Sequence, residues 1–157
     1  MVGRDSEVDL AEAYRHTQAG IVIVVAVGIT AAALVFGVYW GPLPRFALLL
    51  AAVLAICIRV FGSLTVDIDS DTLLVRFGFG LVRKRFILSE VLSAQPVRNR
   101  WYHGWGIHPM RRGWVYNVSG FDAVEIELRD GSVHRIGTDE PQALAVAIKE
   151  ASGLPAN

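Results

Sequence analysis

The feature that most constrains this chain is a change of character near residue 64. Residues 17–64 are apolar and almost free of charge, whereas residues 65–157 alternate short apolar runs with turn residues. A chain of 157 residues has room for one small domain beside such a segment. We therefore expect a membrane-anchored domain, divided into an N-terminal segment (1–19), a two-helix transmembrane hairpin (20–64) and a folded domain (65–157).

The first apolar run extends from Gly20 to Trp40 and carries no charge. At about 1.5 Å of rise per residue, a helix of this length crosses a hydrocarbon core of about 30 Å. Tyr39 and Trp40 stand at its end, where aromatic rings favour the headgroup layer. The long acidic segment before the run argues against a cleaved signal peptide.

The second apolar run follows a turn predicted at Gly41–Pro44 and extends from Phe46 to Leu64, interrupted by Arg59. We favour a spanning helix in which Arg59 reaches the interface by snorkelling, and a functional charge within the membrane is the alternative. Two spans return the chain to its starting side. Because basic residues follow the second span, the positive-inside rule places both termini in the cytoplasm, with the anchor in the cytoplasmic membrane.

Beyond residue 64, the hydrophobic period changes to two and then, near the C-terminus, to that of a helix. Asp130-Gly131 predicts a two-residue hairpin turn. Thr138–Pro141 is typical of a helix start, and Gly153 of a helix end. About seven antiparallel strands are predicted before this helix, at 64–69, 72–79, 82–88, 91–97 (ending near Pro96), 114–118, 123–128 and 132–136.

This order of elements resembles that of bacterial membrane-anchored pleckstrin-homology-like (PH-like) proteins, over about residues 64–152. The resemblance implies a mainly-β barrel capped by a C-terminal α-helix, and a binding or scaffolding role without catalysis. Eukaryotic relatives of the fold often bind phosphoinositides, although a fold does not carry its ligand with it. The segments that carry the resemblance are Leu64–Leu88, Gly104–Ile107, Gly113–Val118 and Val124–Ala147.

Basic residues gather between positions 76 and 112, where Glu90 is the only acid. Arginine mixed with Trp and Tyr suits anionic headgroups and also the centres of protein interfaces. Some of these side chains are also expected to fill or solvate the barrel, and the three roles stay open. The candidate lipid- or partner-binding residues are Arg83, Lys84, Arg85, Arg98, Arg100, Trp101, Tyr102, Trp105, Arg111 and Arg112.

Other chemistries find little support in the sequence. His103 and His108 are poorly spaced for a metal, and we expect no metal or other cofactor. Ser132 and His134 lack an orienting third group, so we expect no enzyme. A net charge of zero argues against nucleic acid as a partner.

The sequence therefore predicts a non-enzymatic binding or scaffolding module at the inner leaflet. Its expected partners are anionic membrane lipids and a membrane protein or another copy of itself. The alternative is an accessory or assembly subunit of a larger membrane complex, because small residues recur every four positions (Ala47, Ala51, Ala55) and let helices approach closely.

Overall fold

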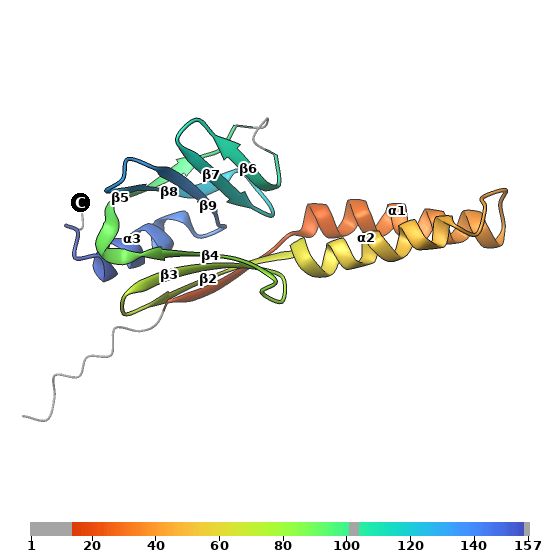
Figure 1. Ribbon diagram of the computed structural model, residues 1–157, viewed down its shortest axis with the longest axis horizontal. Helices are drawn as coiled ribbons and strands as arrows, with labels where there is room; N and C mark the ends of the chain where they lie inside the picture. The colour runs from red at the N-terminus through yellow and green to blue at the C-terminus, as the bar shows by residue number, and fades with distance from the viewer. Residues whose placement is uncertain (1–13, 101–103, 156–157) are drawn as a thin grey trace, which may run out of the picture.

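The computed structural model describes residues 14–100 and 104–155. Two helices project from one end of a domain made of two β-sheets, and a third helix lies between the sheets toward the opposite end (Figure 1). The third helix, α3 (Pro141–Ala151), contacts strands of both sheets. An apolar helix near the N-terminus, a mainly-β domain and a C-terminal helix thus follow one another as the sequence predicts.

The projecting helices are α1 (Ile21–Tyr39) and α2 (Ala47–Phe61), which run side by side (Figure 1). No residue of α1 is buried, and within the described part of the chain α1 is the one helix long and apolar enough to cross a membrane. The expected second span to Leu64 was too long. After Phe61 the chain passes through Gly62 directly into a strand, and α2 has 15 residues.

A strand that the sequence did not predict precedes α1. This strand, β1 (Arg15–Ala19), pairs antiparallel with β2 (Ser63–Asp69), with Ala19 opposite Ser63. The amide of Gly20 donates a 2.8 Å hydrogen bond to the carbonyl of Gly62 where the two helices leave the sheet. The helical hairpin is therefore an insertion between two neighbouring strands, and the expected N-terminal segment belongs to the domain from residue 15 onward.

The first sheet continues through β3 (Thr72–Phe77) and β4 (Val82–Ile87) in the order β1-β2-β3-β4. A short 3₁₀ turn (Leu88–Glu90) leads to the second sheet, which has the order β5-β8-β9-β7-β6. Its strands are β5 (Val91–Arg98), β6 (Gly106–Met110), β7 (Gly113–Asn117), β8 (Asp122–Leu128) and β9 (Val133–Gly137).

The expectation of about seven antiparallel strands was wrong in number and in direction. The described residues form nine strands, and β7 pairs with β9 in parallel. The strand β6 contains Pro109, and β5 runs past Pro96 to Arg98. Both are outermost strands of their sheet, where a missing backbone donor is tolerated, so proline did not end them.

The core lies between the two sheets and under α3. Leu73, Val75 and Phe77 alternate inward along β3, as the period of two predicts. Ile136 of β9 and Leu144 of α3 are buried in the same cluster. A hairpin joins β8 to β9 at the predicted place, with Gly131 at φ +80°, but its turn is longer than the two residues predicted: the Leu128 amide bonds the Ser132 carbonyl, and the Gly131 amide bonds the Leu128 carbonyl across Arg129 and Asp130. The predicted limits of α3 are confirmed, and Gly153 follows its end at φ +67°.

Candidate membrane-facing site

Three segments of the β-domain lie at the end from which the helices leave. The turn between β3 and β4 (residues 78–81) is one of them. The Gly78 amide donates a 2.9 Å hydrogen bond to the Ser63 carbonyl. Gly78 has φ +50°, and a Cβ there would collide with the carbonyl oxygens of Arg59 and Val60. This turn therefore packs on the backbone of the last turn of α2.

The turn between β7 and β8 (residues 118–121) packs at the start of α1. A Cβ on Gly20 would lie 3.2 Å from the Val118 carbonyl oxygen, and Gln18 Nε2 donates a 3.3 Å hydrogen bond to the Ser119 carbonyl. The Asn99 amide donates a 2.6 Å hydrogen bond to the Phe121 carbonyl. The segment that follows β5 is thereby held at the same end of the domain.

These segments carry large apolar side chains that remain exposed within the described chain. Phe79 and Leu81 are 66% and 68% exposed, and Trp105 and Phe121 are exposed as well. Arg98 ends β5 at the same end of the domain, opposite Asp122, the residue after Phe121. We call the set Phe79, Leu81, Trp105, Phe121 and Arg98 the helix-root rim. An apolar rim with an adjacent cation is the composition expected of a surface at the headgroup layer.

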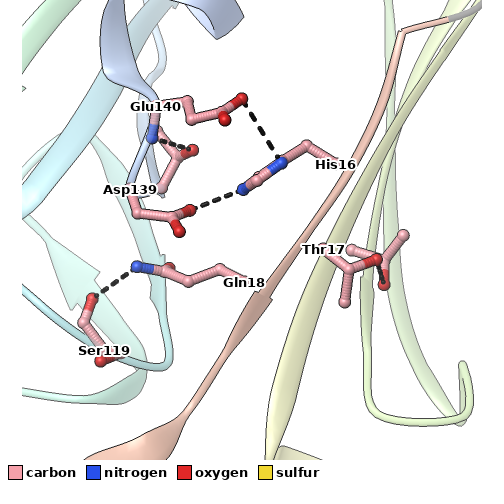
Figure 2. Close-up of polar contacts among 8 residues, drawn as sticks. His16, Thr17, Gln18, Ser119, Asp139 and Glu140 are labelled. Carbon is pink, nitrogen blue, oxygen red and sulfur yellow. Dashed lines mark hydrogen bonds and ion pairs between the residues drawn. The ribbon is translucent and has the colours of Figure 1, made fainter.

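The strand that leads into α1 is tied across to the second sheet (Figure 2). His16 Nε2 lies 2.6 Å from Asp139 Oδ1, and His16 Nδ1 lies 3.4 Å from Glu140 Oε2. Burial, and then the carboxylates of Glu140 and Asp139, raise the pKa of Tyr14 to about 12. Strand β1 therefore connects the start of α1 to the residues that precede α3.

The predicted basic run on β4 is divided between the two faces of the sheet. Arg83 and Arg85 point to the outer face with Arg76, whereas Lys84 shares the inner face with Phe86, its Nζ 5.6 Å from the ring centre. The run also recedes from the helices. At about 3.3 Å per residue, Arg85 lies roughly 10 Å beyond Val82.

Arg111 and Arg112 lie at the far end of the domain, in the turn between β6 and β7. They are about 17 Å, the length of β7, from the helix-root rim. Arg112 Nη2 donates to the Gly131 carbonyl at 2.8 Å and to Glu127 Oε1 at 3.1 Å. Among the candidates, Arg98 at the end of β5 and Trp105 before β6 both lie at the end from which the helices leave, but at opposite edges of the second sheet, whereas Arg111 and Arg112 lie at the far end. Trp101 and Tyr102 lie outside the described residues.

Sequence reasoning missed Phe79, Leu81 and Phe121 as candidate contacts. A signal was present, because each is a large apolar residue within or beside a glycine turn, where small polar residues predominate. What the sequence did not reveal was that two such turns meet at the helix roots.

Within residues 14–100 and 104–155, no group of three or more His, Cys, Asp or Glu side chains could hold a metal ion. No protein-family model matches the chain, and no curated protein matches it either.

Proposed function

We propose that this chain is a non-enzymatic, membrane-anchored binding module whose helix-root rim rests on the anionic inner leaflet of the cytoplasmic membrane. In this proposal α1 and α2 both span the bilayer, and both termini lie in the cytoplasm. The observation that carries the proposal is the insertion of the helical hairpin between the paired strands β1 and β2. If the hairpin spans the bilayer, that connection would put the rim next to the surface from which the helices emerge, and this supports the proposal.

The helices themselves support insertion into lipid. Every residue of α1 is at least partly exposed, which would be costly in water at about 25 cal/mol per Å² of apolar surface. At about 1.5 Å per residue, α2 is roughly 22 Å long, and a shorter span is accommodated by local thinning of the bilayer at modest cost. Arg59, exposed in the last turn of α2, is then level with the headgroups.

Distance decides which basic residues could serve the membrane. Electrostatic attraction to a charged surface fades within a Debye length, about 8 Å at physiological salt. Arg98 at the rim lies within that range, while Arg85 and the Arg111–Arg112 pair lie beyond it. The anchor keeps the rim at high effective concentration next to lipid, so weak headgroup contacts suffice.

The PH-like resemblance is part of the proposal. A run of mostly antiparallel strands followed by one helix packed on both sheets is compatible with it. The alternative, an accessory subunit, rested on the small residues Ala47, Ala51 and Ala55 of α2. Ala47 and Ala51 are buried within the hairpin. These alanines therefore offer little surface to another subunit.

The test uses the full chain with Cys57→Ala, carrying one cysteine labelled with a polarity-sensitive dye. Leu81→Cys reports on the rim, and Ser89→Cys, at the opposite end, is the matched control. In vesicles containing phosphatidylglycerol, we expect the dye at position 81 to emit at the shorter wavelength. Arg98→Glu should reduce this difference, and Arg111→Glu should not. Equal emission from both positions would show that the rim does not meet the membrane.

A further inference from the structure

The outermost position of β4 leaves one edge of the first sheet unpaired within the described residues. The pairing of β3 with β4 is continuous from Thr72–Ile87 to Phe77–Val82, with no bulge to disrupt the edge. An unpaired, regular edge offers a row of backbone donors and acceptors to a further strand. The free edge of β4 is therefore competent to accept one.

A cavity of about 240 Å³ lies along this edge. Residues 84–87 of β4 line one side of it, and the other lining residues are Glu90, Leu128, Asp130, Ser132 and His134. His134 is 6% exposed, its ring centre is 4.9 Å from that of Phe86, and its Nδ1 has no hydrogen-bond partner. The cavity thus combines apolar side chains (Phe86, Ile87, Leu128) with charged ones (Lys84, Arg85, Glu90, Asp130) and with the unpartnered Nδ1 of His134.

The outer face of the same edge carries two cations. Arg83 and Arg85 are exposed, and neither has an ion pair among the described residues. On the same sheet, by contrast, Arg15 and Arg76 both pair with Asp67. Two unpaired cations at alternate positions of a free strand suit an added strand that has acids at alternate positions.

The chain contains such a sequence before β1. In the segment Asp5-Ser6-Glu7-Val8-Asp9-Leu10, acids alternate with Ser6, Val8 and Leu10. A strand places alternate residues on opposite faces. Set beside β4, the acids would face the two arginines, while Val8 and Leu10 would face the cavity. A single register therefore places the acids next to the arginines and the apolar side chains next to the cavity.

The distance decides which copy supplies the segment. Tyr14 lies at the far edge of the sheet, where its carbonyl accepts a hydrogen bond from the Ile68 amide. A position outside β4 is four strand spacings away from β1, about 19 Å. The four residue steps from Leu10 to Tyr14 span at most about 14 Å. The segment therefore falls short of its own β4.

From these observations we infer that residues 5–10 of a second copy of this chain pair with β4, and that the exchange is reciprocal in a homodimer. The inference uses the proposed anchorage only in that two copies in one membrane stand in the same orientation. Val8 or Leu10 of the second copy would enter the cavity beside Phe86.

Charge reversal tests the inference on the full chain in mild detergent, with two differently tagged copies expressed together. One variant carries Arg83→Glu and Arg85→Glu, and the other carries Asp5→Lys, Glu7→Lys and Asp9→Lys. Each variant alone should lose co-purification of the two tags by about tenfold or more, equivalent to ~1.4 kcal/mol. Expressed together, the two variants should recover it, because each segment then meets an edge of opposite charge.

Arg111→Glu with Lys149→Glu is the matched control, since it makes the same charge change away from β4, and it should co-purify as the unmodified chain does. Thermal unfolding of each variant confirms that it folds. The inference would be overturned if two differently tagged copies of the unmodified chain did not co-purify. Variants that co-purify normally alone, or a mixed pair that does not recover, would also overturn it. Loss of the rim's contact with lipid would leave these results unchanged, so the two proposals fail separately.

Discussion

At the scale of single residues, substitutions at two glycines of the β3–β4 turn distinguish the cost of backbone strain from the cost of lost packing. Gly78 and Gly80 both have positive φ, but only at Gly78 would a Cβ meet backbone atoms, those at the end of α2. At Gly80 the nearest atom is Arg76 Cδ at 3.8 Å. We expect Gly80→Ala to cost about 1–2 kcal/mol of stability for its φ.

Gly78→Ala should cost about 1–3 kcal/mol more than Gly80→Ala, because the turn must also move off α2. Chemical denaturation of the two variants in the same detergent measures the difference. Equal losses would mean that the β3–β4 turn does not bear on the helix root.

His134 makes a prediction about pH. Burial, and then the charge of Lys84, lower the pKa of His134 below its ordinary value of 6.5. The unfolded chain therefore takes up a proton at a higher pH than the folded chain does. The contribution to stability should be complete above about pH 6.5 and be lost as the pH falls below it.

Unfolding curves between pH 5 and 8 check this, with His134→Gln expected to flatten the acid side. His108→Gln makes the same chemical change at a residue whose ring bonds to the Trp105 carbonyl in the β5–β6 segment. That variant should keep the acid loss, and a flattened curve there as well would assign the effect elsewhere.

At the scale of elements, β1 decides what an independently folding domain must contain. A fragment beginning at residue 63 loses β1, its pairing with β2 and the contacts of His16 with Asp139 and Glu140. Ala19 and Ser63 are direct register partners, so Asn-Gly in place of residues 20–62 would join β1 to β2 by a two-residue turn.

We expect the joined chain to be folded and to melt at least about 5 °C above the fragment, since a loss of ~1 kcal/mol shifts Tm by that much in a domain of this size. Circular dichroism on heating measures both. If the fragment melts as high as the joined chain, β1 is dispensable.

At the scale of the whole molecule, the hairpin predicts opposite sides for its loop and for the domain. In a Cys57→Ala background, Leu43→Cys reports on the loop between α1 and α2, and Ser89→Cys reports on the domain. A membrane-impermeant maleimide applied to intact spheroplasts should label position 43, and position 89 only after lysis. Labelling of both positions from one side would mean that the hairpin does not cross.

The local patterns predicted much of this architecture because they act through neighbours in the chain. The charge-free run became α1, the alternation at 72–77 became β3, and the proline and glycine signals set the limits of α3. In contrast, β1 reads Arg-His-Thr-Gln-Ala and has no apolar alternation. It forms a strand because it pairs with the edge of β2, and no pattern within residues 15–19 predicts that pairing.

The candidate site, like the fold, was predicted from the sequence only in part. Composition was sufficient to indicate a basic and aromatic region between residues 76 and 112. Only the folded chain decides that Arg98 and Trp105 lie at the helix roots, that Arg112 bonds the β8–β9 turn and that Lys84 faces inward. Distance from the helices depends on strand direction, and strand direction follows from pairings between residues far apart in the sequence. By itself, the sequence determined the long apolar helix and the elements whose apolar residues recur with a regular period, because these signals act between neighbours in the chain. The tertiary structure decided the strand β1 and which side chains stand at the end from which the helices leave, because both depend on pairings between distant residues.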